Sequence, residues 1–127
     1  MNVLDDEIQS RYQAVMDLAN EIVEQLNAEV AKLGFSVSDV RIRSADEADY
    51  RLEKDPSTSA YALVGEWFDE RGGKLGSILF HADDSFYAEQ DVVKPHPSKK
   101  GWFVEAVNAW GKAGRIKSEA RLLPMPE

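Results

Sequence analysis

One small set of polar residues has the side-chain types that acid–base chemistry or metal binding requires. The stretch 60–93 holds His81 and Tyr87 together with Glu66 and Glu89. If these residues share one sheet face, the carboxylates raise the pKa of the histidine and let it shuttle a proton near neutral pH. Imidazole and carboxylate groups also bind divalent metals. No motif fixes this spacing, so a solvated strand face is the competing interpretation, and no metal or catalytic residue is predicted.

The aspartates that follow this histidine allow a second interpretation. Asp83 and Asp84 carry the oxygen ligands that a hard cation such as magnesium prefers. Aspartates in such a position more often form turns, because their short side chains accept hydrogen bonds from nearby backbone amides. Calcium-loop, Walker-type, dinucleotide-binding and Gly-x-Ser-x-Gly patterns do not occur in the sequence. We therefore predict a turn here, and no cofactor.

A basic segment, 94–100, precedes residues 102–111, whose apolar spacing predicts a helix. The free amides and dipole of a helix N-terminus attract anions, and nearby lysines add positive charge. Lysines that open a helix behind a three-stranded sheet resemble, in topology, the phosphate contacts of double-stranded-RNA-binding domains. An anion or nucleic-acid contact through this segment is therefore one hypothesis, and an ordinary solvated connection is the alternative. The residues concerned are Lys94, Lys99 and Lys100.

Two aromatic residues, Phe68 and Trp102, fall outside the apolar stripes that the surrounding sequence predicts. If they are exposed together, they form an apolar patch suited to a protein partner. Filling of the core is the competing interpretation, because most aromatic residues at such spacings are buried.

The element that must position these side chains is a predicted antiparallel meander over 60–93. Three runs rich in aliphatic and aromatic residues are separated by two short turn signals. The pair Gly72-Gly73 fits a two-residue hairpin loop, because glycine adopts the positive φ that such loops need. The register that follows pairs Trp67 with Ile78, Gly65 with Phe80, and His81 with Tyr87.

Side chains alternate along a strand, so this meander has two different faces. The predicted core face holds Leu63, Trp67, Ile78, Phe80, Phe86 and Ala88. The predicted open face is mixed and holds Val64, Glu66, Phe68, Ser77, Leu79, His81, Tyr87, Glu89 and Asp91.

Residues 4–33 read as one long amphipathic helix, with apolar residues at spacings of three and four and Gly34 as its stop. About 30 residues at roughly 1.5 Å each give a helix of about 45 Å, whereas a strand of about nine residues spans about 30 Å. The helix must therefore overhang the sheet, bend, or pack against a second copy. The heptad-like spacing makes a homodimer possible.

The remaining segments complete an α+β architecture. We predict a strand at 40–43, a polar loop at 44–59 with room for one helical turn at 45–52, the helix at 102–111 and an edge strand at 116–123. One antiparallel sheet of about four to five strands, with 60–93 at its centre, is covered on one face by the long N-terminal helix and the shorter C-terminal helix.

Composition limits the class of protein. The 127 residues are enough for a single domain, 1–127, and the 43% hydrophobic content indicates a folded chain. The absence of cysteine excludes disulfides, thiol nucleophiles and cysteine-ligated metals. No leader or membrane-spanning run is evident, which makes a cytoplasmic location the expectation. The net charge of −8 disfavours nonspecific binding to nucleic acid or membranes.

These features favour a small acidic noncatalytic protein-binding module that self-associates, with the open sheet face and the nearby acidic loop as its binding surface. In build it resembles type III secretion chaperones and toxin-immunity proteins, which are likewise small, acidic and α+β. The alternatives are a small-molecule-binding protein or enzyme that uses the His81 set, and an anion or nucleic-acid contact through 94–100. The partner itself stays unknown.

Overall fold

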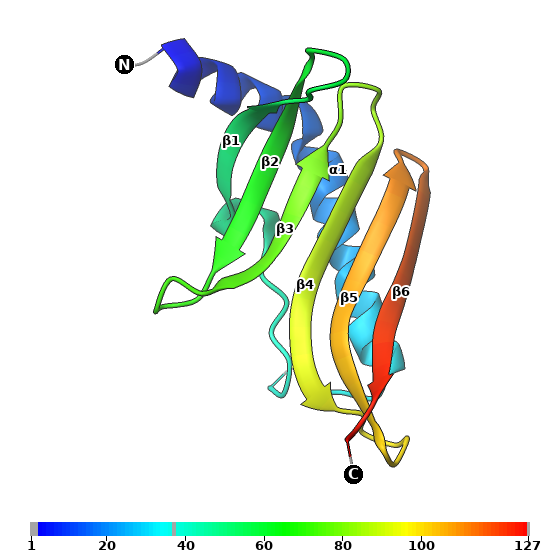
Figure 1. Ribbon diagram of the computed structural model, residues 1–127. Coiled ribbons are helices and arrows are strands. Elements are labelled where there is room, and N and C mark those ends of the chain that lie inside the picture. The colour runs from blue at the N-terminus through cyan, green and yellow to red at the C-terminus, as the bar shows by residue number, and fades with distance from the viewer. Residues whose placement is uncertain (1–2, 37, 127) are drawn as a thin grey trace.

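A computed structural model describes residues 3–36 and 38–126, and Figure 1 shows one long helix behind one sheet. The sheet has six antiparallel strands that lie side by side in sequence order. The α+β class, the single antiparallel sheet and the long N-terminal helix are therefore confirmed, but the predicted number of four to five strands was too low. The elements are α1 (Val3–Lys32), the 3₁₀ turn η1 (Ala45–Glu47), β1 (Asp49–Lys54), β2 (Tyr61–Phe68), β3 (Lys74–Phe80), β4 (Phe86–Pro95), β5 (Trp102–Lys112) and β6 (Arg115–Pro124).

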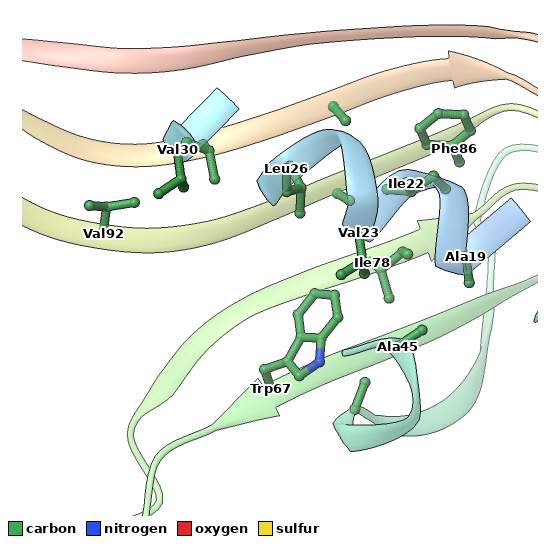
Figure 2. Close-up of a cluster of buried hydrophobic side chains, with 14 of the residues drawn as sticks. Ala19, Ile22, Val23, Leu26, Val30, Ala45, Trp67, Ile78, Phe86 and Val92 are labelled. Atoms are coloured by element: carbon green, nitrogen blue, oxygen red, sulfur yellow. The ribbon is translucent and has the colours of Figure 1, made fainter. Parts of the chain in front are cut away.

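Helix α1 runs diagonally across one face of the sheet (Figure 1). The part of its predicted apolar stripe from Ala19 to Val30 is buried against the strands, as Figure 2 shows. Polar contacts join the helix to strands in both halves of the sheet. Arg11 donates to the carbonyl oxygen of Tyr61 in β2 at 3.0 Å. Gln25 donates to the hydroxyl of Ser118 in β6 at 2.8 Å. The helix therefore reaches from β2 to the edge strand β6.

Trp67 in β2 is part of the core and lies near Val23 of α1 and Ala45 of η1 (Figure 2). Its side chain is only 1% exposed. The indole Nε1 donates to the carbonyl oxygen of Ser44 at 2.8 Å, which satisfies its one polar group. This contact attaches the segment before β1 to the sheet.

The two faces of the meander are confirmed, but the predicted register was wrong by two residues. Trp67 lies opposite Gly76 and Gly65 lies opposite Ile78. The reason is a longer loop, in which the Asp69 carboxylate accepts hydrogen bonds from the backbone amides of Arg71 and Gly73. Because side chains alternate with a period of two, a shift of two residues leaves the side chains of the paired strand residues on their predicted faces.

The predicted C-terminal helix is wrong, because residues 102–111 form strand β5. The ladder between β5 and β6 shifts between Val104 and Ala106, which marks a β-bulge. The bulge lets Val104 and Val107 both face the core, where both are fully buried. It therefore creates a spacing of three that imitates one face of a helix.

Two further expectations about the sheet were wrong. Residues 40–43 are not a strand: the side-chain amide of Gln90 instead bonds both the amide and the carbonyl of Arg43, at 2.8 and 2.9 Å. The predicted loop 44–59 contains the edge strand β1, which was not expected, and the 3₁₀ turn η1, which lies within the predicted helical turn at 45–52. The last strand, β6, lies at the opposite edge of the sheet, as predicted. Within 3–36 and 38–126, no helix is both long and apolar enough to cross a membrane.

Candidate functional site

The face of the sheet opposite α1 is covered by no other element among the described residues (Figure 1). We call it the uncovered face. Residues paired across antiparallel strands point to the same side, so side chains on this face form rows that run across the strands. Two neighbouring rows differ sharply in character.

The first row is apolar and crosses four strands. Val64, Leu79, Tyr87 and Trp110 are successive partners in β2, β3, β4 and β5. Val64 is 5% exposed, and the other three side chains are half-buried. We call these four residues the apolar row. Cations extend it at both ends, because Val64 pairs with Arg51 in β1 and Trp110 pairs with Lys117 in β6.

The second row is acidic and lies about 7 Å away, two residues along each strand. We call its carboxylates the acidic row: Asp49, Glu66, Glu89 and Glu119. Ser77 and Asn108 fill the two remaining positions of this row. The uncovered face therefore places a line of carboxylates directly beside a line of apolar side chains.

Cations from neighbouring positions pair with the two central carboxylates. Glu66 contacts Arg51 and accepts a bond from Lys74 at 3.0 Å, and these two partners hold its pKa below the usual value. Glu89 accepts bonds from Arg121 Nη2 and from the Tyr87 hydroxyl, each at 2.9 Å. Burial raises the pKa of Tyr87, and its bond to Glu89 raises it further, so this phenol stays protonated.

The carboxylates near Arg121 outnumber the cations. Arg121 Nη2 lies 2.9 Å from Glu89 Oε2, and Arg121 Nη1 lies 3.8 Å from Glu105 Oε1, so one guanidinium pairs with both carboxylates. Partial burial raises the pKa of Asp91, and repulsion from Glu89 and Glu105 raises it further. This part of the face therefore carries negative charge that the described residues do not neutralise.

Asn108 is the one buried polar side chain on this face whose bonding is incomplete among the described residues. It is 4% exposed and lies between Glu89 and Glu119 in the acidic row. Its Nδ2 donates weakly to Glu119, at 3.4 Å. Its Oδ1 accepts no hydrogen bond from the described part of the chain. Such an acceptor is costly to leave without a donor.

The predicted ligand-binding set is only partly assembled. Glu66, Tyr87 and Glu89 lie together on the uncovered face, but His81 does not join them. Strand β3 ends at Phe80, and Leu79 occupies the place opposite Tyr87 that was predicted for His81. Among residues 3–36 and 38–126, no three His, Cys, Asp or Glu side chains are grouped to hold a metal ion.

His81 instead lines a hollow of about 790 Å³ between α1 and the loops at one end of the sheet. The histidine is exposed, and its backbone amide donates to the carbonyl of Ser85 at 2.8 Å. Asp83 accepts from the Ser85 amide at 2.9 Å, which confirms a turn. The apolar side of the hollow includes Val15, Leu18, Leu63 and Phe80, and its basic side chains are Arg11 and Lys112.

The other two predicted groups are dispersed. The helix N-terminus on which the anion prediction depended does not exist, because Lys94 lies in β4 and the rest of the basic segment connects β4 to the strand β5. There the ammonium of Lys99 lies 4.1 Å from the ring centre of Trp102, a cation–π contact. Phe68 is 42% exposed at the end of β2, on the uncovered face. Trp102 alternates with Phe103 and shares the core side with Val104, so the two aromatics do not form one patch.

Sequence reasoning missed three residues of the uncovered face: Asn108, Trp110 and Arg121. The first two lay in the segment predicted as a helix. From Val107 to Gly111 the sequence does alternate between small apolar residues and larger or polar ones. That period of two was the available signal for a strand.

No protein-family model, curated protein or solved structure matches this chain.

Proposed function

We propose that this protein is a noncatalytic protein-binding module and that the uncovered face is its binding surface. The observation that carries the proposal is the apolar row, which crosses the middle of the sheet and is bordered by charged residues. Protein interfaces commonly have this arrangement, an apolar centre with a polar rim. Tyrosine, tryptophan and arginine contribute most often to binding energy, and Tyr87, Trp110 and Arg121 lie in or beside the rows.

The size of the face agrees with this function. Six strands at about 4.8 Å spacing are about 24 Å wide, and about eight residues along a strand span about 27 Å. The resulting area of roughly 650 Å² is close to the roughly 800 Å² that one partner contributes to a standard interface. The separation of His81 from Glu66 and Glu89, and the ion pairs of those carboxylates, favour binding over acid–base catalysis.

Replacing Trp110 with alanine tests this proposal. The tagged protein is used to capture its partner from the native host, the partner is identified by mass spectrometry, and the affinity is then measured with purified components. A buried aromatic anchor at the centre of an interface contributes at least about 2 kcal/mol, so we expect the affinity to fall by about 30-fold or more. Circular dichroism checks that the variant stays folded.

Trp102→Ala is the matched control, because it is the same substitution at a half-buried residue on the other side of the sheet. We expect this variant to bind the partner like the wild-type protein. Equal affinity of the Trp110→Ala variant and the wild type overturns the proposal. Loss of binding by the Trp102 variant instead moves the interface away from the uncovered face, which also overturns it.

The hollow beside His81 favours a second candidate function, binding of a small molecule. Its volume of about 790 Å³ lies in the usual range for ligand sites. Native mass spectrometry of the protein purified from its host should then detect a bound small molecule. His81→Ala should remove that molecule while the melting temperature of the protein stays unchanged. A spectrum of the variant identical to that of the wild type rejects this candidate.

A further inference from the structure

We infer that the partner presents a basic amphipathic helix to the uncovered face, a conclusion that rests on the proposed function. In this arrangement the apolar stripe of the helix contacts the apolar row. Lysine or arginine side chains along one flank of the helix contact the acidic row. Charge, hydrogen bonding and dimensions each support this choice of partner.

The charge of the face selects a cationic partner. Glu89, Glu105 and Asp91 lie near Arg121, and Lys74 is a further cation near Asp91, so three carboxylates face two cations at the border of the acidic row that is farther from the apolar row. A lysine or arginine from outside would supply the counter-ion that this group lacks. Pairing with a cation would also offset the mutual repulsion of the three carboxylates.

The hydrogen bonding of the acidic row selects the same chemistry. The two carboxylates on either side of Asn108, Glu89 and Glu119, can only accept hydrogen bonds. Ammonium and guanidinium groups are donors only, with three and five N–H bonds respectively. One such group can therefore bond to a carboxylate of this row, whereas an acidic partner would add further acceptors.

The direction and spacing of the rows select a helix. The rows run across the strands at intervals of about 4.8 Å, which is close to the 5.4 Å rise of one helical turn. Successive turns of a helix can thus meet successive strands. The four residues of the apolar row span about 14 Å, or about ten helical residues. Helix α1 already crosses the strands on the opposite face, from Tyr61 in β2 to Ser118 in β6.

A second copy of this chain is a poor occupant. The exposed side of α1 is acidic and carries Asp17, Glu21 and Glu24. These carboxylates would face the acidic row, and like charges brought together at an interface are unfavourable. The inferred helix therefore belongs to a different protein.

Two synthetic peptides of about 18 residues test the inference. Both have the same leucine stripe on a helical repeat, with lysine on the flank in one peptide and glutamate in the other. Binding to the full-length protein is measured by fluorescence anisotropy at physiological ionic strength. We expect the lysine peptide to bind and the glutamate peptide not to bind. Binding of the two peptides with equal affinity overturns the inference.

Paired charge variants separate binding at this face from general attraction to an acidic protein. Glu89→Gln with Asp91→Asn should weaken the lysine peptide at least tenfold. Glu21→Gln with Glu24→Gln removes the same charge from the exposed side of α1 and should leave the affinity unchanged. Equal weakening by the two double variants overturns the inference. Asp91→Asn alone, at an exposed residue, should act in the same direction even if the double variant is unstable.

The outcomes for the inference and for the proposed function are distinct. If Trp110→Ala releases the natural partner but the lysine peptide shows no dependence on Glu89 and Asp91, only the inferred partner chemistry is wrong. If Trp110→Ala leaves the natural partner bound, the uncovered face is not the interface and both proposals fail.

Discussion

Alanine in place of Trp67 should lower the free energy of unfolding by about 3–5 kcal/mol, the usual cost of truncating a large buried aromatic. The side chain is 1% exposed and lies where α1, β2 and η1 meet. Its loss would leave a cavity and would remove the bond to the Ser44 carbonyl. Since whole domains are stable by about 5–15 kcal/mol, this change alone consumes a large part of the total. Urea denaturation measures it.

Trp110→Ala is the control for this prediction, because it deletes the same atoms from a half-buried residue on the uncovered face. We expect Trp110→Ala to lower the free energy of unfolding clearly less than Trp67→Ala does, since less apolar surface returns to water and no closed cavity forms. A pair of variants with the same urea midpoint would mean that Trp67 is not the central residue of the core.

Alanine in place of Gly76 should have the second large effect, more than about 3 kcal/mol, because a new methyl group would collide with backbone. A Cβ at this position would lie 2.1 Å from the carbonyl oxygen of Glu89 and 2.9 Å from the Cα of Gln90. Neither atom can move without displacing β4, which pairs with β3 at this point. Thermal unfolding should show a much lower midpoint.

Gly73→Ala is the matched substitution for this test. There the new Cβ would approach only the carboxylate of Asp69, at 2.7 Å, at the end of a side chain in an exposed loop. We expect a cost below about 1 kcal/mol, as for most surface changes. If the two alanine variants melt together, then the close approach of β3 and β4 at Gly76 is not a constraint on the fold.

The sequence predicted best where a periodic pattern was long. Helix α1 followed from apolar residues at spacings of three and four over 30 residues. The two faces of the meander followed from alternation and survived an error of two residues in the register. For this reason alternation alone assigns Val64, Leu79 and Tyr87 of the apolar row to the correct face.

The sequence predicted poorly where a single residue changes the pattern. The bulge near Glu105 gave β5 the spacing of a helix, so Asn108 and Trp110 were assigned to the wrong element. Strand β1 is polar because it is an exposed edge, and its one large ring, Tyr50, covers Gly65. The predicted register had instead placed Phe80 opposite Gly65. The pattern of β2 and β3 gave no sign that a further strand, β1, pairs with the other side of β2.

His81 illustrates how the end of a strand decides a site. Alternation alone places it on the uncovered face, but β3 ends one residue earlier, and His81 belongs to the loop that lines the hollow beside α1. The bond from its amide to Ser85 and the turn at Asp83 are local features that hydrophobic periodicity does not encode.

The sequential order of the strands has a consequence for synthesis of the protein. Each strand pairs with the one made just before it, so the sheet can grow as the chain emerges from the ribosome. Helix α1 is made before the six strands, yet Ser118, which donates a hydrogen bond to Glu29, is made only 89 residues later. At roughly 5–20 residues per second, its apolar stripe waits roughly 4–18 s for the last strand. A newly made α1 is thus an amphipathic segment that chaperones have time to bind before β6 is made and packs against it.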